Sequence, residues 1–266
     1  MEDPQATQPN CIPSVSACVV IPARHASTRL PGKMLLRETG RSLIEHTHEA
    51  ALAAKLPSQV VVATDHESIF EEVERFGGRA VMTSVDCKSG TDRVAEVARQ
   101  MPEHDLFVNL QGDEPEIDPG AIDRVIEVLR NNPTTPMATV AAPLTQAELL
   151  HDPSVVKVVF DRLGRALYFS RSPIPFVRDT VSATEANQAA LFHHHVGLYA
   201  YRPEFLERFA DLPASKLEEA EKLEQLRVLE AGEAIHVGVI PTASSGIDTP
   251  SDYAAFVSRQ CRRAAA

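Results

Sequence analysis

The sequence predicts an α/β fold in which helices cover both faces of a parallel sheet. In its first two-thirds, short apolar runs alternate with amphipathic segments of helical length, which is the order that βαβ units produce. The run from Val60 to Ala63 is β-branched and continuously apolar rather than alternating, as expected for a strand buried on both faces. Polar or charged residues follow each run, at the edge where parallel sheets bind their ligands.

The first half of the chain is expected to contain three buried strands. They cover residues 18–21, 60–63 and 106–110. The first helix is predicted over 42–55, because Ser42 and Glu45 have the spacing of a capping box. Asp65 is expected to cap the second helix, which Gly77-Gly78 ends.

The helix that follows the third strand begins at Asp118-Pro119, with proline in the favoured first position. The pattern changes after Val140. Two strands, 155–160 and 166–169, are expected to form a hairpin. We therefore interpret residues 155–200 as an inserted β-rich arm and a candidate dimer contact.

The last part of the chain returns to the α/β pattern. It is predicted to contain a capped helix over 215–231, a strand over 235–240 and a final helix after Pro250. We interpret 17–266 as a single domain that includes the arm, and 1–16 as a flexible extension.

Composition and charge restrict the partners and the compartment. The chain has 266 residues, with 26 basic and 37 acidic side chains and a net charge of -11 at pH 7. Nucleic acids and anionic membranes need a cationic face, so we expect neither as a partner. The N-terminus has no signal-peptide pattern, and no apolar run is long enough to span a bilayer. The four cysteines are scattered without a C-x-x-C pair, which is typical of reduced thiols in a cytoplasmic protein.

The loop from Pro22 to Lys33 carries the strongest functional signal. It places Arg24, Arg29 and Lys33, together with a glycine, directly after the first strand. Three cations beside free backbone N–H groups suit a nucleoside triphosphate, which brings about four negative charges. The loop lacks the Walker A pattern. A solvated basic loop is the alternative, but the position at a strand end favours a phosphate site.

Carboxylates that follow two strands are candidate metal ligands. Asp113 and Glu114 come after the third strand, and Asp248 comes after the strand 235–240. Magnesium takes one or two protein carboxylates and completes its shell with phosphate and water. Asp113 and Asp248 could therefore share one ion if the fold brings them together. For the Asp113 segment, a turn rich in Asp and Pro is the alternative.

Two further groups of polar residues are candidate ligand contacts. Glu224, with its neighbour Gln225, interrupts the apolar stripe of the predicted capped helix, and a carboxylate there needs a partner. A surface salt bridge is the alternative. In the run His193-His-His195 we expect no zinc site, because no cysteine or carboxylate stands at ligand spacing. We interpret His195 and Tyr199 as a polar pair directed at a ligand.

Together these segments resemble the 3-deoxy-manno-octulosonate (KDO) cytidylyltransferases, also called CMP-KDO synthetases. The resemblance is carried by blocks in the same order, from about Cys18 to the last helix. The blocks are Ile21–Lys33, Val62–Asp65, Ser89–Arg93, Val108–Pro115, Ala166–Arg171, Ile174-Pro175, His195–Tyr199, Leu223–Arg227 and Gly246–Pro250. The chain departs from the family at His25 and Met34, where tyrosine and proline are usual.

The resemblance implies a nucleotide-diphospho-sugar transferase fold, a Rossmann-like three-layer sandwich with an inserted dimerisation arm, and a homodimer. It implies transfer of CMP from CTP to the anomeric hydroxyl of KDO for lipopolysaccharide biosynthesis, with Mg²⁺ and release of pyrophosphate. Carried onto matching positions, it implies that CTP contacts Pro22, Ala23, Arg24, Arg29, Lys33, Ser89, Gly90 and Gln111. The implied metal ligands are Asp113 and Asp248, which are also catalytic with Arg24 and Lys33. The implied sugar-acid contacts are Arg171, His195, Tyr199, Glu224 and Gln225.

Two other functions stay open from the sequence. One is a cytidylyltransferase for a different sugar acid, such as neuraminate or 8-amino-KDO; the phosphate loop and the Phe169–Pro175 segment favour KDO. The other is a non-catalytic regulator that binds a nucleotide sugar. The presence of both Asp113 and Asp248 argues against a protein that only binds.

Overall fold

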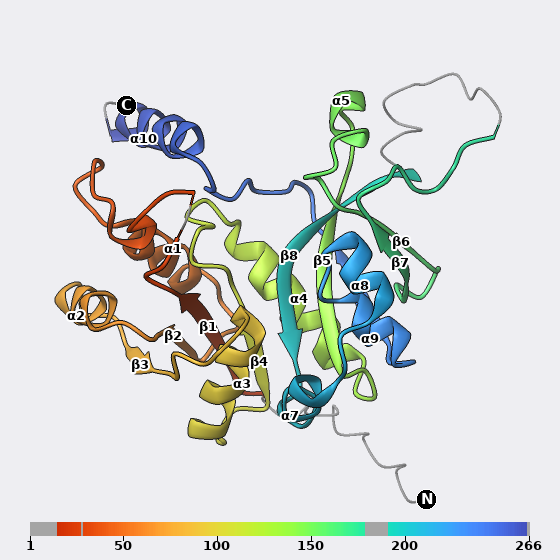
Figure 1. The fold of residues 1–266 in the computed structure, drawn as a ribbon, viewed down its shortest axis with the longest axis horizontal. Coiled ribbons are helices and arrows are strands. Elements are labelled where there is room, and N and C mark those ends of the chain that lie inside the picture. The colour runs from red at the N-terminus through yellow and green to blue at the C-terminus, as the bar shows by residue number, and fades with distance from the viewer. Residues whose placement is uncertain (1–14, 28, 179–190, 265–266) are drawn as a thin grey trace, which may run out of the picture.

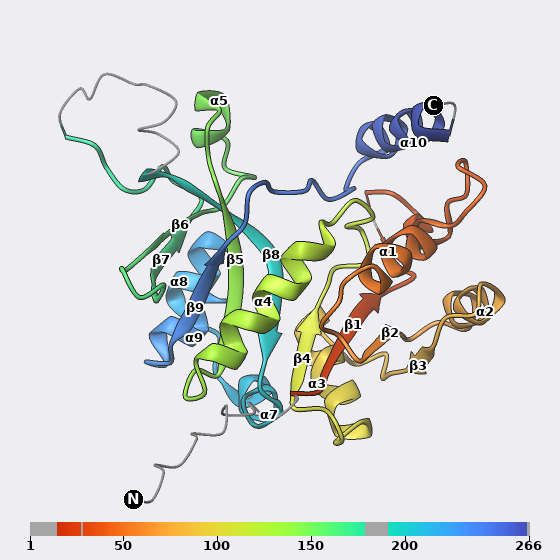
Figure 2. The same cartoon turned by 180° about the vertical axis from the view of Figure 1, so that it is seen from behind.

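A computed structural model of the protein describes residues 15–27, 29–178 and 191–264. Its centre is a mostly parallel sheet with helices on both faces (Figures 1 and 2). The predicted α/β fold is therefore confirmed. Most of the predicted extension 1–16, and residues 179–190 of the predicted arm, lie outside the described residues.

The strands are β1 (Ala17–Ala23), β2 (Gln59–Thr64), β3 (Ala80–Met82), β4 (Leu106–Asn109), β5 (Met137–Pro143), β6 (Lys157–Phe160), β7 (Ala166–Ser170), β8 (His193–Tyr201) and β9 (Ile235–Val239). Their order across the sheet is β3-β2-β1-β4-β8-β5-β9. Outside this order, β6 and β7 form a hairpin, and β6 also pairs with β8. Along this path every pair is parallel except the two pairs of β8, which runs antiparallel between β4 and β5.

The helices are α1 (Leu43–Leu52), α2 (Glu67–Arg75), α3 (Gly90–Gln100), α4 (Pro119–Asn131), α5 (Ala147–Leu150), α7 (Pro203–Asp211), α8 (Lys216–Glu221), α9 (Leu226–Glu230) and α10 (Pro250–Ala264), with a 3-10 turn η1 (Lys33–Leu35). Residues of α1, α2 and α4 share one buried cluster with the sheet. Residues of α3, α7 and α9 share a second cluster on the opposite face. None of the described helices has the length and apolar character that crossing a membrane requires.

Side-chain alternation along β1 explains why its sequence is continuously apolar. Val19 and Ile21 belong to the cluster of α1, α2 and α4, whereas Cys18 and Val20 belong to the cluster of α3 and α7. All four side chains are fully buried. Successive residues of a strand point to opposite faces, so a strand covered on both sides needs an unbroken apolar run.

Most of the predicted boundaries are confirmed. The three strands predicted in the first half correspond to β1, β2 and β4. Asp118 caps α4 by accepting a hydrogen bond from the N–H of Gly120. Gly77 adopts a φ of 80° just after α2, as a residue that ends a helix does. Ser42 caps α1 by accepting the N–H of Glu45 at 3.3 Å.

Two of the predicted caps need correction. Asp65 does not cap α2; the ring of His66 does. The Asp65 carboxylate pairs instead with Arg93 at 2.8 Å, because the buried guanidinium group needs a counter-charge. At α1 the carboxylate of Glu45 pairs with Arg75 at 3.1 Å, so the reciprocal bond of a capping box is replaced by an ion pair.

The single helix predicted over 215–231 is wrong. The chain forms two short helices, α8 and α9, separated by Lys222 in a left-handed conformation with φ 53°. The turn allows Leu223 and Leu226 to bury their side chains in the cluster of α3 and α7. The guanidinium group of Arg171 donates to the carbonyl groups at the end of α8, which satisfies acceptors that a helix end leaves open.

The second half of the chain contains both confirmed and unpredicted elements. The hairpin of β6 and β7 is confirmed, with Gly164 at φ 82° in its turn. The strand β9 and the last helix, α10, are confirmed as well. The elements β3, β5, α3 and α7 are not predicted from the sequence. The last helix lies beside the first, since α10 and α1 are neighbours in both views (Figures 1 and 2).

We predict that Gly238→Ala destabilises the protein by about 1–3 kcal/mol, the usual cost of overpacking a core. A methyl group on Gly238, in β9, would lie 2.8 Å from Cγ2 of Val128 on α4. Gly197→Ala in β8 is the matched control, because a methyl group there meets no atom within 4 Å. Urea unfolding measures the free energy of unfolding of both variants and of the wild type. Equal free energies of unfolding would contradict close packing between β9 and α4.

Candidate active site

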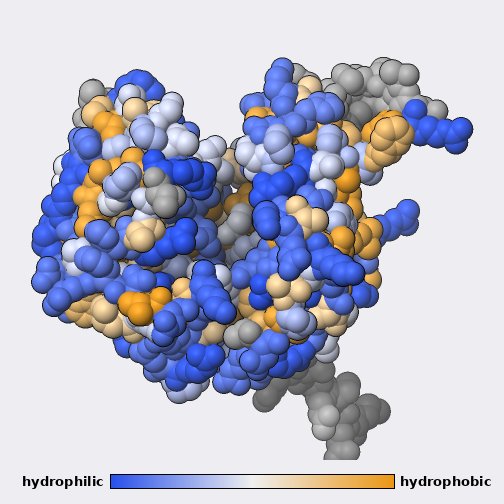
Figure 3. All heavy atoms as spheres, viewed as in Figure 1, coloured by the Kyte–Doolittle hydropathy of each residue, from blue (hydrophilic) through white to orange (hydrophobic). Residues whose placement is uncertain are grey.

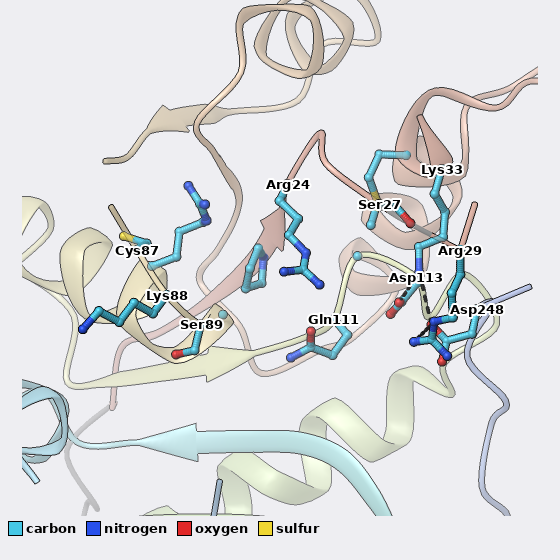
Figure 4. Close-up of a pocket in the computed structure, with 15 residues that line it drawn as sticks. Arg24, Ser27, Arg29, Lys33, Cys87, Lys88, Ser89, Gln111, Asp113 and Asp248 are labelled. Carbon is cyan, nitrogen blue, oxygen red and sulfur yellow. Dashed lines mark hydrogen bonds and ion pairs between the residues drawn. The ribbon is translucent and has the colours of Figure 1, made fainter. Parts of the chain in front are cut away.

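A cavity of about 420 Å³ opens at the carboxyl ends of β1 and β4 (Figure 4). On the surface, a deep recess divides one face of the molecule, with many hydrophilic side chains along its rim (Figure 3). The cavity is lined by Pro22, Arg24, Ser27, Arg29, Lys33, Met34, Cys87, Lys88, Ser89, Gly90, Arg93, Gln111, Gly112, Asp113 and Asp248. These residues come from the loops after β1 and β4, from the start of α3 and from the segment before α10.

Leu30 and Gly32 fix the course of the loop after β1. Leu30 packs in a small buried cluster with Ile247 and Phe256 of the C-terminal segment. Gly32 has a φ of 63°, a conformation that favours glycine, and this turn leads directly into η1. The loop therefore presents Arg24 and Arg29 to the cavity while its far end is anchored in the core.

Lys33 is buried and donates hydrogen bonds to two carboxylates and one carbonyl group. Its Nζ lies 2.6 Å from Oδ2 of Asp113, 2.8 Å from the carbonyl oxygen of Ile247 and 3.4 Å from Oδ1 of Asp248. Arg29 donates to the same Oδ1 atom of Asp248 at 3.1 Å. Figure 4 shows these side chains converging at one end of the cavity.

The loop after β4 sits tightly against β1. A methyl group on Gly112 would lie 3.1 Å from the carbonyl oxygen of Pro22 and 3.1 Å from Sδ of Met34, so a larger residue would have to push one of these neighbours aside. The hydroxyl group of Thr47, on α1, donates to the carbonyl oxygen of Gly112 at 2.8 Å. Next to it, the N–H of Ile247 donates to the carbonyl oxygen of Asp113 at 2.9 Å.

Glu114 follows Asp113 but is turned away from Lys33 into the protein. Its carboxyl group accepts a hydrogen bond from Ser244 at 2.9 Å. Burial raises the pKa of Glu114 to about 7; the bond from Ser244 opposes this shift, and the charge of Asp113 adds to it. Of the two adjacent carboxylates that the sequence offers as metal ligands, Asp113 is the one that lines the cavity.

Asp113 and Asp248 fit a divalent cation. Both carboxylates contact one ammonium nitrogen, that of Lys33, so a small positive charge is already accommodated between them. One or two carboxylates, with the rest of the shell left to phosphate and water, are what Mg²⁺ takes from proteins. The structure thus brings together the two aspartates that the sequence could only propose as partners.

The start of α3 forms the opposite end of the cavity. Ser89 caps this helix and forms a full capping box with Asp92. A methyl group on Gly90 would lie 3.5 Å from Cγ of Pro22 and 3.6 Å from Nε2 of Gln111. The predicted nucleotide contacts Ser89, Gly90 and Gln111 are therefore neighbours at the N-terminus of α3.

Among the predicted CTP and metal residues, only Ala23 does not line the cavity, because its side chain is fully buried in the core. Six lining residues are not predicted as sites: Ser27, Met34, Cys87, Lys88, Arg93 and Gly112. Ser27, Arg93 and Gly112 lie inside the blocks that carry the family resemblance. Met34, Cys87 and Lys88 lie one or two residues outside them, so the signal for all six was their place in or beside these blocks.

Four of the predicted sugar-acid residues lie in a second region, on β8 and on the link between α8 and α9. Oε2 of Glu224 accepts a hydrogen bond from the Thr91 hydroxyl at 2.7 Å, and burial raises the pKa of Glu224. Gln225 is buried, and its Nε2 finds no hydrogen-bond partner among the described residues. His195 and Tyr199 have ring centroids 5.4 Å apart.

His195 is a neutral group in this second region. It is buried, and its Nε2 lies 3.0 Å from the Thr139 hydroxyl. Burial, with a smaller effect of His194, lowers the pKa of His195 to about 3. Burial also raises the pKa of Tyr199 well above its usual value, so both groups are uncharged at neutral pH and can only donate or accept hydrogen bonds.

Arg171, the fifth predicted sugar-acid residue, lies beside α8, and its guanidinium group donates hydrogen bonds to backbone carbonyl groups. Nε donates to the carbonyl oxygen of Glu221 at 2.6 Å, and another nitrogen donates to that of Pro153 at 2.7 Å. The Glu221 carboxylate accepts the N–H of Arg171 at 2.9 Å. Arg171 therefore holds the end of α8, directly ahead of Glu224.

A cavity lined by cationic side chains at the carboxyl edge of a parallel sheet, with two aspartates at one end, has the position and the charges that suit an anionic ligand with a divalent cation. The comparisons with known proteins agree. The sequence model of the family described as "Cytidylyltransferase" matches residues 18–235.

Individual relatives define the family more narrowly. A 3-deoxy-manno-octulosonate cytidylyltransferase of Rhodopirellula baltica is 46% identical over 242 residues, 91% of this chain and 97% of that protein. One of Geotalea daltonii is 49% identical over 240 residues, 88% of this chain and 93% of that protein. A solved structure of CMP:2-keto-3-deoxy-manno-octonic acid synthetase in complex with CTP has a TM-score of 0.86 and 40% identity, and covers 93% of this chain and 99% of that one. The chain belongs to the family of 3-deoxy-manno-octulosonate cytidylyltransferases, so the resemblance inferred from its sequence is confirmed.

We predict that Thr91→Val raises the pKa of Glu224 further, because the hydrogen bond from Thr91 opposes the effect of burial on this carboxyl group. A titration followed by NMR of the labelled carboxyl carbon measures the change. Thr91→Ser keeps the hydroxyl group and is the matched control, so its Glu224 should titrate as in the wild type. An unchanged pKa in Thr91→Val would contradict the bond.

Proposed function

We propose that the protein transfers CMP from CTP to the anomeric hydroxyl group of KDO. The oxygen of that hydroxyl group attacks the α-phosphorus, the bond to the β-phosphate oxygen breaks, pyrophosphate leaves, and the hydroxyl proton is released. The observation that carries the proposal is the meeting of Arg29, Lys33, Asp113 and Asp248 in one cavity, in a chain from a family named for this activity.

CTP would lie along the cavity, with its triphosphate toward the end that holds Lys33, Asp113 and Asp248. Arg24 and Arg29 are exposed and can neutralise phosphate charge. Ser89, Gly90 and Gln111 would contact the cytosine and the ribose at the other end. Catalysis of this kind depends mainly on positioning and on charge neutralisation, since the protein need not form a covalent bond to the substrate.

Asp113 and Asp248 would hold Mg²⁺ between the protein and the phosphates. When bound, this ion supplies positive charge to the phosphate oxygens and lowers the pKa of a hydroxyl group that contacts it. The support for this assignment is that both carboxylates already share one cationic partner.

The sugar acid would bind beside Glu224 and Gln225, with His195, Tyr199 and Arg171 around it. The support is that Glu224 accepts a hydrogen bond from Thr91, which directly follows Gly90 of the cavity lining. Arg171 matches a carboxylate in shape and charge, and binding one would require it to exchange some of its contacts with backbone carbonyls.

A homodimer built through the arm is also proposed. The hairpin of β6 and β7 and the residues after it expose large apolar side chains, namely Leu163, Leu167 and Phe176. Several exposed apolar side chains on one arm are typical of a contact surface. A monomeric mass in sedimentation equilibrium would argue against the dimer.

Pyrophosphate release tests the proposed reaction directly. We expect release with CTP, Mg²⁺ and KDO, and much slower release when ATP, GTP or UTP replaces CTP. Neuraminate and 8-amino-KDO are the comparison acceptors. Pyrophosphate release with one of these two acceptors but not with KDO would refute KDO as the substrate. No pyrophosphate release with any sugar acid would favour a regulator that binds the nucleotide sugar without catalysis.

We predict that Asp113→Asn lowers the rate of pyrophosphate release roughly 100-fold or more, because it removes one of the two carboxylates proposed to hold Mg²⁺. CTP binding, measured by calorimetry, should persist because the cationic side chains are intact. Asp211→Asn on the exposed end of α7 is a control with the same chemical change. Wild-type turnover by Asp113→Asn would contradict the metal assignment.

A further inference from the structure

We propose that Lys33 competes with a divalent cation for Asp113 and Asp248, so that the metal binds tightly only together with the nucleotide. The ammonium group would then act as a placeholder, keeping the two carboxylates assembled until phosphates draw it away. The identity of the nucleotide, CTP, rests on the proposed function; the competition itself rests on contacts of Lys33.

The hydrogen-bonding capacity of Lys33 is fully used within the protein. A lysine ammonium group has three donors and no acceptor. Its three partners are Oδ2 of Asp113, the carbonyl oxygen of Ile247 and Oδ1 of Asp248. The side chain is 8% exposed, which leaves little room for a further ligand. Lys33 can therefore bind a phosphate oxygen only by giving up one of these contacts.

The same carboxylates are those that fit the metal. A divalent cation that binds Asp113 and Asp248 must come close to the charge on Nζ, which lies 2.6 Å from one carboxylate and 3.4 Å from the other. Two positive charges held by the same two carboxylates would lie only a few ångströms apart, and they repel strongly in a partly buried site. As long as Lys33 keeps its place, the affinity of the two aspartates for a metal should be low.

A triphosphate removes this conflict. It brings about four negative charges and gives Nζ a new anionic partner in the same cavity, so Lys33 can release a carboxylate without losing a charged contact. Because the coupling of two ligands is reciprocal, the nucleotide should strengthen metal binding by the factor with which the metal strengthens nucleotide binding. Metal and nucleotide would enter as one unit.

The test is a titration with Mn²⁺, which takes the same oxygen ligands as Mg²⁺ and is detected by electron paramagnetic resonance. Without nucleotide, Lys33→Met should bind Mn²⁺ at least about tenfold more tightly than the wild type, because a charge-assisted contact of each carboxylate has been removed. The variant should also lose most of the coupling between Mn²⁺ and CTP.

Lys88→Met is the matched control. Lys88 lines the same cavity, and its substitution by methionine removes the same charge. In the described contacts, however, Lys88 makes no ion pair with Asp113 or Asp248. Its Mn²⁺ affinity should change less than about threefold, as expected for an exposed charge. Equal effects of the two variants, or unchanged or weaker Mn²⁺ binding by a folded Lys33→Met, would overturn the proposal.

A measurement on the wild type covers the case in which Lys33→Met does not fold, which circular dichroism would reveal. After subtraction of the Mn²⁺ that CTP binds in a protein-free titration, CTP should tighten Mn²⁺ binding to the wild-type protein at least about tenfold; equal affinity with and without CTP would overturn the proposal. KDO is absent from every titration. A protein that uses another sugar acid would thus fail the pyrophosphate assay with KDO and still give the expected Mn²⁺ result.

Discussion

The ammonium group of Lys33 joins three segments that are far apart in the sequence. It connects the loop after β1 with Asp113 after β4 and with the Ile247–Asp248 segment before α10. Without a cation at this point, two carboxylates would face each other in a partly buried site, which is costly. The geometry of the candidate active site therefore depends on one buried charge and on the backbone around it.

The sheet explains why these three segments can meet. The strands β1 and β4 are parallel neighbours, so the loops at their carboxyl ends lie side by side. After β9 the chain returns to this edge, where a backbone bond from Ile247 to Asp113 holds it. The packing of α10 on α1, through Phe256 and Leu43, fixes the same segment from the other side. Close approach at Gly112 completes the arrangement.

Local patterns in the sequence predict buried strands such as β1 and caps such as Asp118, because both depend mainly on neighbouring residues. They miss short or less regular strands such as β3 and β5. They do not predict tertiary partners. Asp65 has the type and position of a cap, yet it pairs with Arg93, and the 215–231 segment has helical periodicity but turns at Lys222 to bury Leu223. The pairing of Asp113 with Asp248 likewise follows only from the fold.

The same limit applies to Lys33. Its sequence position indicates a phosphate contact, but spacing cannot reveal that its three donors are already used. A crystal structure with CTP and Mg²⁺ tests the central claim most directly. We expect the metal on both Asp113 and Asp248, with Nζ of Lys33 moved from at least one of them to a phosphate oxygen. A complex in which Lys33 keeps all three protein contacts while the metal binds to other residues would contradict it.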